Sequence, residues 1–189
     1  MTSTLSPTLA LEEFLLLPET KPASEFADGK VVQKIPPRLR HSWLRIRLCR
    51  WLDDSLTPNY EAFLELRCTF GGQSLVPDIA VLSAGQIPRN AEGEIGDDVF
   101  VAPRVAVEIL SPGQTMADFE EKARFYISHG VQVALLIDPE DKRVQVFRPG
   151  MAPQMLGLDG VLEDSALPGL RLPVAELFGW LKAGVAGRA

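Results

Sequence analysis

Two short apolar segments, each with a single carboxylate inside it, decide how this chain folds; they read Leu75-Val76-Pro77-Asp78-Ile79-Ala80-Val81-Leu82 and Val105-Ala106-Val107-Glu108-Ile109-Leu110-Ser111-Pro112. Their length, their β-branched residues and the Gly, Pro and Ser residues that bound them predict buried strands. Burying a carboxylate in such a strand is costly unless a charged or hydrogen-bonding group compensates it. Because two acids are placed in this way, the sequence predicts a metal site at Asp78 and Glu108.

A hard divalent cation suits this pair of acids. Two carboxylates on adjacent strands can hold Mg²⁺ (or Mn²⁺) through oxygen ligands, and water and a phosphate complete the octahedron. Such an ion polarises the phosphate and lowers the pKa of an attacking water. The simpler alternative is that each acid lies at a strand end, exposed to solvent or capping a loop. For one acid alone that alternative is preferred, whereas two acids in apolar strands favour the site.

The rest of the chain mixes helices and strands without strict alternation. The patterns predict helices at 8–18, 38–56, 115–129 and 173–182, strands at 60–70, 76–82, 105–110, 131–138 and 143–148, and a hairpin at 25–35 that turns at Asp28-Gly29. Residues 83–103 are typical of a long surface loop, and residues 149–166 of a mobile stretch. This mixture predicts one α/β or α+β domain with a mixed central sheet.

Length, charge and cysteine content narrow the class of protein. A chain of 189 residues fits a single domain, expected to span 1–189 with flexible ends at 1–7 and 184–189. The net charge of −6 argues against nonspecific coating of nucleic acid, although an enzyme with a local basic patch remains compatible. No apolar stretch approaches the roughly 20 residues of a membrane span. Without a signal peptide, and with only Cys49 and Cys68 as cysteines, a cytoplasmic location is expected.

An ordered series of motifs resembles a known family. Pro77-Asp78 followed by Glu108 resembles the PD-(D/E)XK nuclease superfamily, and the chain is most similar to its Uma-type restriction endonuclease family. The match comprises Leu11-Glu12-Glu13-Phe14, Glu25-Phe26-Ala27-Asp28-Gly29, His41, Val76-Pro77-Asp78, Val107 to Pro112, Asp118 to Tyr126, Gly130-Val131, Ile137-Asp138-Pro139, Leu167-Pro168-Gly169-Leu170 and Leu177-Phe178. The resemblance implies a restriction-endonuclease-like fold with helices flanking the sheet. It also implies a Mg²⁺-dependent endonuclease acting on DNA, with the Ile109 carbonyl as a third metal ligand.

One position departs from the superfamily pattern. The motif places a lysine two residues after the second acid, where this chain has Leu110. The resemblance implies that Lys122, on the following helix, takes the catalytic place. At 100° per residue Lys122 lies beside Tyr126, at the edge of the apolar stripe formed by Met116, Phe119, Ala123, Tyr126 and Ile127. The alternative is an Asp118–Lys122 surface pair worth about 0.2–0.5 kcal/mol.

Three further features carry weaker predictions. Glu25 alone reads as a solvated strand start, but the resemblance implies that it lies near the metal. His41 falls on the inward arc of its helix, where a core histidine is the usual case and a position facing the site is the other. Residues 38–50 hold five arginines and no acid. They are interpreted as a solvated helix face in preference to a surface that grips phosphate.

Two other classes of function stay open. The missing strand lysine and the acidic charge are also compatible with a nuclease-fold protein that binds nucleic acid or a partner without cutting. An assembly module is the second, with apolar segments such as Met151 to Leu158 serving a homodimer.

Overall fold

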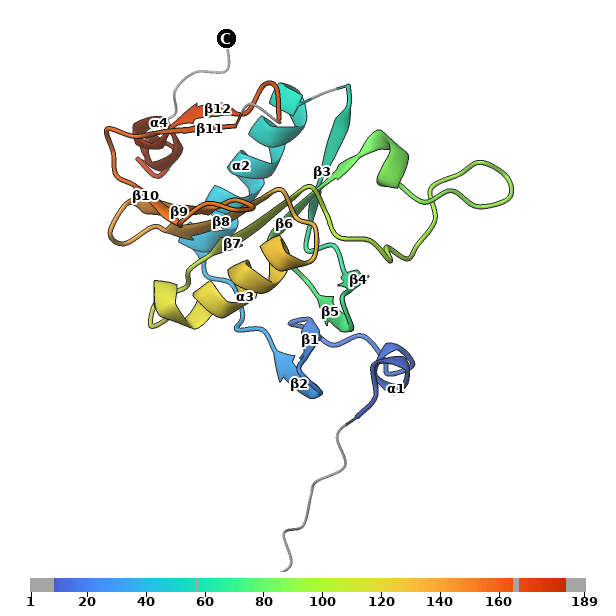
Figure 1. The fold of residues 1–189 in the computed structure, drawn as a ribbon. Helices are drawn as coiled ribbons and strands as arrows, with labels where there is room; N and C mark the ends of the chain where they lie inside the picture. The colour runs from blue at the N-terminus through green and yellow to red at the C-terminus, as the bar shows by residue number, and fades with distance from the viewer. Residues whose placement is uncertain (1–8, 57, 165–166, 183–189) are drawn as a thin grey trace, which may run out of the picture.

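A six-stranded mixed sheet forms the centre of the protein, seen in a computed structural model that describes residues 9–56, 58–164 and 167–182 (Figure 1). Its strand order is β10-β9-β8-β7-β6-β3, in which β7 and β8 run parallel and every other neighbouring pair is antiparallel. The strands are β3 (Tyr60–Leu64), β6 (Ile79–Ser83), β7 (Val105–Ile109), β8 (Val133–Asp138), β9 (Arg143–Phe147) and β10 (Gln154–Leu156). The predicted single domain with a mixed sheet is confirmed.

Helices cover both faces of this sheet (Figure 1). One face packs against α2 (Leu39–Leu56), α4 (Val174–Gly179) and the hairpin of β11 (Val161–Glu163) and β12 (Arg171–Pro173). The other face packs against α3 (Met116–Ser128), which connects the parallel strands β7 and β8. Side chains alternate along β7, so Val107 lies in the α2 core and Ala106 in the α3 core. Glu108 therefore faces the same side as α3.

The protein has a second sheet, which contains four strands. Its order is β2-β1-β5-β4, formed by β1 (Ser24–Ala27), β2 (Lys30–Gln33), β4 (Cys68–Phe70) and β5 (Gln73–Leu75). The predicted hairpin is confirmed, since β1 and β2 pair around Asp28 and Gly29, whose φ angles are 51° and 72°. Positive φ at both positions is what a two-residue type I′ turn requires. The shorter elements are α1 (Leu11–Leu15) and η1 (Ala84–Gln86).

Several predicted boundaries are wrong. The strand expected at 60–70 is two strands in different sheets, because Glu65 between them adopts a φ of 49°. The strand expected from Val76 begins at Ile79. The backbone of Val76 is instead bound by side chains. Its N–H donates to the Glu25 carboxylate, and its carbonyl accepts from the Lys34 ammonium.

The segments near the two ends of the chain also differ from expectation. The stretch 149–166, expected to be mobile, contains β10 and β11. The helix expected at 8–18 is limited to α1, and the helix expected at 173–182 is limited to α4. The cap expected at residue 8 and the flexible ends expected at 1–7 and 184–189 lie outside the described residues. Across the described ranges, no helix is both long enough and apolar enough to cross a membrane.

Candidate active site

Strand register brings the two acids of the sequence motif together. In the antiparallel pair of β6 and β7, Ile79 lies opposite Val107. Asp78, one residue before β6, therefore falls beside Glu108 of β7. Both are buried, with 2% and 1% of their surface exposed. The backbone N–H of Ile109 donates to Asp78 Oδ2 at 2.8 Å, so the carboxylate of one strand is fixed by the backbone of the next.

Asp78 is held as a carboxylate by three donors. Lys34 Nζ lies 2.8 Å from its Oδ1, and His41 Nε2 lies 3.0 Å from its Oδ2, to which the Ile109 N–H also donates. Burial alone would raise the pKa of Asp78, but the His41 hydrogen bond and the Lys34 charge hold it below its usual range. His41 is thus buried, as a core histidine would be, and it also faces the site. Both interpretations left open by the sequence therefore apply to it.

Glu108 has a different environment on each of its oxygens. Lys122 Nζ lies 2.7 Å from Oε1, and the Tyr126 hydroxyl donates to the same oxygen at 2.7 Å. Oε2 is buried and has no hydrogen-bond partner among the described residues. Burial raises the pKa of Glu108, although the charges of Lys122 and Lys34 oppose this. The two neighbouring carboxyls are therefore shifted in opposite directions, a pattern typical of functional sites.

Lys122 reaches the acids from α3. Its Nζ contacts Glu108 and lies 2.7 and 2.9 Å from the two oxygens of Glu25, which in turn accepts from the Val76 N–H. The alternative of an Asp118–Lys122 surface pair is wrong, because Asp118 instead accepts from the backbone and side chain of Thr115 at the start of α3. Leu110 packs in the α3 core, so the position of the usual lysine is apolar here.

Lys34 is the member of the cluster that the sequence patterns did not predict. Its Nζ lies 2.8 Å from Asp78 Oδ1 and 3.7 Å from Glu108 Oε2, and it donates to the Val76 carbonyl at 2.7 Å. It follows β2, all four residues of which are exposed, so local patterning gave no sign of burial. The hairpin register was an available signal. Glu25 lies opposite Val32, and Lys34, two residues further, must share that face.

The donor set fits a hard divalent cation. Carboxylate oxygens are the preferred ligands of Mg²⁺, and the buried Glu108 Oε2 is an oxygen for which the described residues provide no hydrogen bond. The described ranges contain no group of three or more His, Cys, Asp or Glu side chains arranged around one metal position. Asp78 and Glu108 would thus be a two-carboxylate set, with water and phosphate completing it. Ile109 enters the cluster through its N–H, and its carbonyl as a third ligand stays a prediction.

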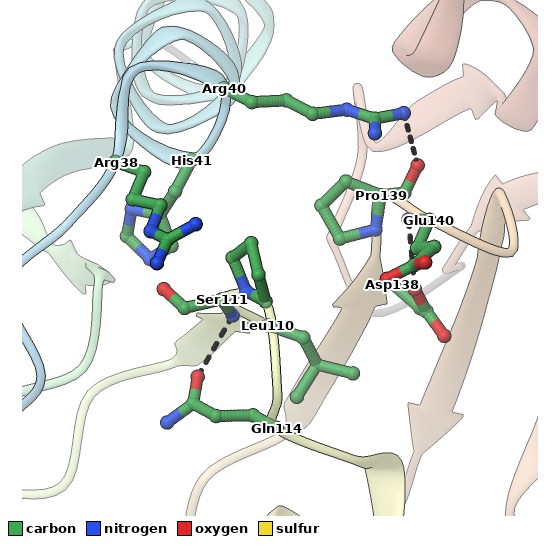
Figure 2. A pocket seen from close by; sticks show the side chains of 10 residues that line it. Arg38, Arg40, His41, Leu110, Ser111, Gln114, Asp138, Pro139 and Glu140 are labelled. Atoms are coloured by element: carbon green, nitrogen blue, oxygen red, sulfur yellow. Dashed lines mark hydrogen bonds between the residues drawn. The ribbon is translucent and has the colours of Figure 1, made fainter.

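A pocket of about 120 Å³ lies beside this cluster and shares His41 with it (Figure 2). Arg38 and Arg40 extend into it from the start of α2, opposite Ser111 and Gln114 from the segment after β7. The Arg40 guanidinium donates to the Pro139 carbonyl at 2.6 Å. The predicted solvated helix face therefore holds for Arg47 and Arg50, which are exposed. Arg45 is half-buried and pairs with Glu65, whereas Arg38 and Arg40 line the pocket.

Tyr126→Phe tests the hydrogen bond that fixes Glu108. Burial and the negative charge of Glu108 raise the pKa of Tyr126 well above its ordinary value, so its hydroxyl stays protonated and donates. Losing this buried bond to a carboxylate is expected to lower the free energy of unfolding by about 1–3 kcal/mol, measured by urea denaturation. Tyr60→Phe, on the half-buried β3, is the control and should change stability by less than about 0.5 kcal/mol. Equal effects of the two substitutions would contradict the assignment.

The mixed sheet and the buried cluster of acids and lysines define a restriction-endonuclease-like protein. The chain belongs to the Uma2 family, described as "Putative restriction endonuclease", whose sequence model matches residues 11–175. This membership supports a nuclease function in general terms.

One solved structure agrees with the family assignment. A crystal structure of a "putative nuclease belonging to DUF820" from Anabaena variabilis ATCC 29413 is 38% identical, with a TM-score of 0.87, and the match covers 92% of this chain and 99% of that one. A cryoEM structure of a DrdV–DNA complex is 13% identical, with a TM-score of 0.38, over 74% of this chain and 11% of that one. A likeness as low as the second bears on neither fold nor function. The search of curated proteins found no match.

Proposed function

We propose that this protein is a metal-dependent endonuclease that hydrolyses DNA phosphodiester bonds. The observation that carries the proposal is the contact between Lys122 Nζ and Glu108 Oε1 at 2.7 Å, beside the buried carboxylate of Asp78. An acid pair and a lysine in one buried cluster form the group of side chains that the family pattern requires. A Mg²⁺ or Mn²⁺ ion bound there would polarise the scissile phosphate and activate water.

Each residue of the cluster has a distinct role in this proposal. Asp78 and Glu108 would hold the ion, with the Ile109 carbonyl as a third ligand. Lys122 stabilises the negative charge that develops on the phosphate, or positions the water. Burial would lower the pKa of Lys122, but the charges of Glu108 and Glu25 raise it, so the side chain stays a cation. Glu25 holds Lys122 through both oxygens and assists at the metal.

The substrate is proposed to be DNA, with the phosphate backbone entering beside His41. Arg38 and Arg40 supply two positive charges to the pocket, although Glu140 and Asp138 also line it. Guanidinium groups suit phosphate oxygens because they donate two parallel hydrogen bonds. The local basic surface at the start of α2 thus provides the phosphate contacts that the acidic chain as a whole does not predict.

The Arg38→Ala/Arg40→Ala double variant is expected to weaken DNA binding about tenfold at low salt, because two phosphate contacts are lost. The slope of log affinity against log salt should become shallower by about 1.8. Fluorescence anisotropy with a DNA duplex in EDTA measures binding without cleavage. Arg47→Ala/Arg50→Ala removes the same charge from exposed positions of α2 and is the matched control. An equal loss in the control would show that only overall charge matters.

The proposal is tested by incubating supercoiled plasmid with the protein in Mg²⁺, Mn²⁺ or EDTA. Wild type is expected to nick or linearise the plasmid with either metal and to be inactive in EDTA. Asp78→Ala and Glu108→Ala should both be inactive. Cleavage that survives both substitutions would contradict the assignment.

A second candidate function is a nuclease-fold module that binds nucleic acid or a partner without cutting. One observation favours it, namely that Lys34 and Lys122 already neutralise much of the charge on the acids. Calorimetric titration with Mg²⁺ separates the two functions, because the absence of any Mg²⁺ binding that depends on Asp78 would favour the module.

A homodimer is proposed in either case. Met151, Met155 and Leu158, around the edge strand β10, are 65%, 48% and 49% exposed. Sedimentation velocity tests this assembly.

A further inference from the structure

Lys34 lies between the two acids at the position that a shared metal ion would need. On Asp78, the Oδ2 atom is already bound by His41 and the Ile109 N–H. On Glu108, the Oε1 atom is already bound by Lys122 and Tyr126. The oxygens left for an ion are Asp78 Oδ1 and Glu108 Oε2, and both face the Lys34 ammonium, at 2.8 and 3.7 Å.

We propose that Lys34 is a built-in competitor of the divalent cation, whose ammonium holds the two acids in the metal-free protein and is displaced when the ion binds. This inference rests on the proposed function, because it concerns the same pair of carboxylates. It adds that metal occupancy of the site is set by an exchange between an internal cation and an external one. Metal affinity is then lower than two buried carboxylates alone would give.

The charges of the cluster explain why one lysine ammonium must move away from the acids when a divalent ion binds. Three carboxylates, from Glu25, Asp78 and Glu108, face two ammonium groups. A divalent ion added beside both ammonium groups would experience their repulsion at a distance of a few ångströms, where protein screening is weak. Displacing one ammonium removes this repulsion and frees the oxygens that it occupies.

The contacts of the two lysines show which of them is displaced. The two lysine side chains are almost equally exposed, at 17% and 16%, so their contacts decide. Lys122 bridges two carboxylates, Glu25 and Glu108, and lies over the Tyr126 ring at 5.8 Å. Lys34 directly follows β2, an exposed edge strand, and has one short contact to a carboxylate, that of Asp78. A lysine stem is flexible and its ammonium is strongly hydrated, so Lys34 can turn into solvent.

Calorimetric titration of the full chain with Mn²⁺ tests the exchange. Lys34→Met and Lys34→Gln remove the competing charge and are expected to lower the apparent Kd for Mn²⁺ by at least about tenfold. Lys30→Met, at an exposed position of β2, carries the same charge change and should bind like wild type. Thermal unfolding gives a second measure. Without metal the Lys34 variants should unfold at lower temperature than wild type, and Mn²⁺ should raise their Tm by more.

The outcomes separate this inference from the proposed function. Equal or weaker Mn²⁺ binding by both Lys34 variants would overturn the competitor role, and plasmid cleavage by wild type would then leave the nuclease proposal intact. If wild type and the variants all failed to bind Mn²⁺, the competitor role and the metal site would both be overturned. Tighter binding in Lys30→Met as well would assign the effect to overall charge and likewise overturn the role of Lys34.

Discussion

Asp78→Asn is expected to lower the rate of DNA cleavage by about a thousandfold or more, equivalent to about 4 kcal/mol of activation free energy. Asparagine keeps the size of the side chain but removes the negative charge that would bind the ion, so the calorimetric signal of Mg²⁺ binding should vanish as well. Lys34 and His41 would face a neutral amide in place of a carboxylate. Cleavage of supercoiled plasmid, quantified over time in Mg²⁺, measures the effect.

The same substitution has a cost in stability that must be separated from the loss of activity. Removing one partner of a buried ion pair destabilises by about 3–5 kcal/mol, and a smaller loss of about 1–3 kcal/mol is expected here because the Lys34 side chain is 17% exposed. Asp164→Asn is the matched control, since Asp164, which follows β11, pairs at 2.8 Å with Arg148, which follows β9, outside the acid cluster. That variant should lose stability and still cleave. Equal losses of cleavage in the two variants would contradict a specific role for Asp78.

Lys122→Met is expected to lower the rate constant of cleavage by about 10²–10³ while Mg²⁺ binding persists. The lysine is proposed to act on the phosphate or the water and not as a metal ligand, so the two measurements should separate. Single-turnover cleavage gives the rate constant, and calorimetry gives the affinity for Mg²⁺. Lys142→Met, in the exposed turn between β8 and β9, is the charge-matched control and should cleave at the wild-type rate.

A second variant tests whether Lys122 on α3 performs the role that the superfamily pattern gives to a lysine on the strand. Leu110→Lys/Lys122→Met returns the cation to the strand position, two residues after Glu108. Because side chains alternate along a strand, the new lysine would lie on the same face as Glu108. We expect part of the lost cleavage rate to return, measured together with the free energy of unfolding because Leu110 is buried in the α3 core. Cleavage at the wild-type rate by Lys122→Met alone would contradict the assignment of Lys122.

The sequence was most informative about the two acids, which the proposed function requires although their burial disfavours folding. An acid in an apolar strand is unfavourable without compensation, so the sequence alone was enough to identify Asp78 and Glu108 as candidates. Helical spacing placed Lys122 at the edge of the core stripe, and it reaches the acids from there. The two acids follow from local patterning, whereas the role of Lys122 was implied by the family resemblance, with which its position on the helix is compatible.

The partners of the acids depend on contacts that are distant in sequence. Lys34 meets Asp78 across 44 positions, and the register of an exposed hairpin decides this contact. The interrupted strand at Glu65 depends on one residue with positive φ, and the late start of β6 depends on side chains of the other sheet. Such features follow from tertiary packing, so local propensity does not predict them.

The central claim is that Asp78 and Glu108 together hold a divalent cation. Its most direct test is an anomalous difference map from a crystal of the full chain grown with Mn²⁺. We predict one peak in contact with both carboxylates, with the Lys34 ammonium moved away from Asp78 Oδ1. A map from Mn²⁺-saturated crystals without a peak at these acids, with Lys34 still bound to Asp78, would contradict the claim.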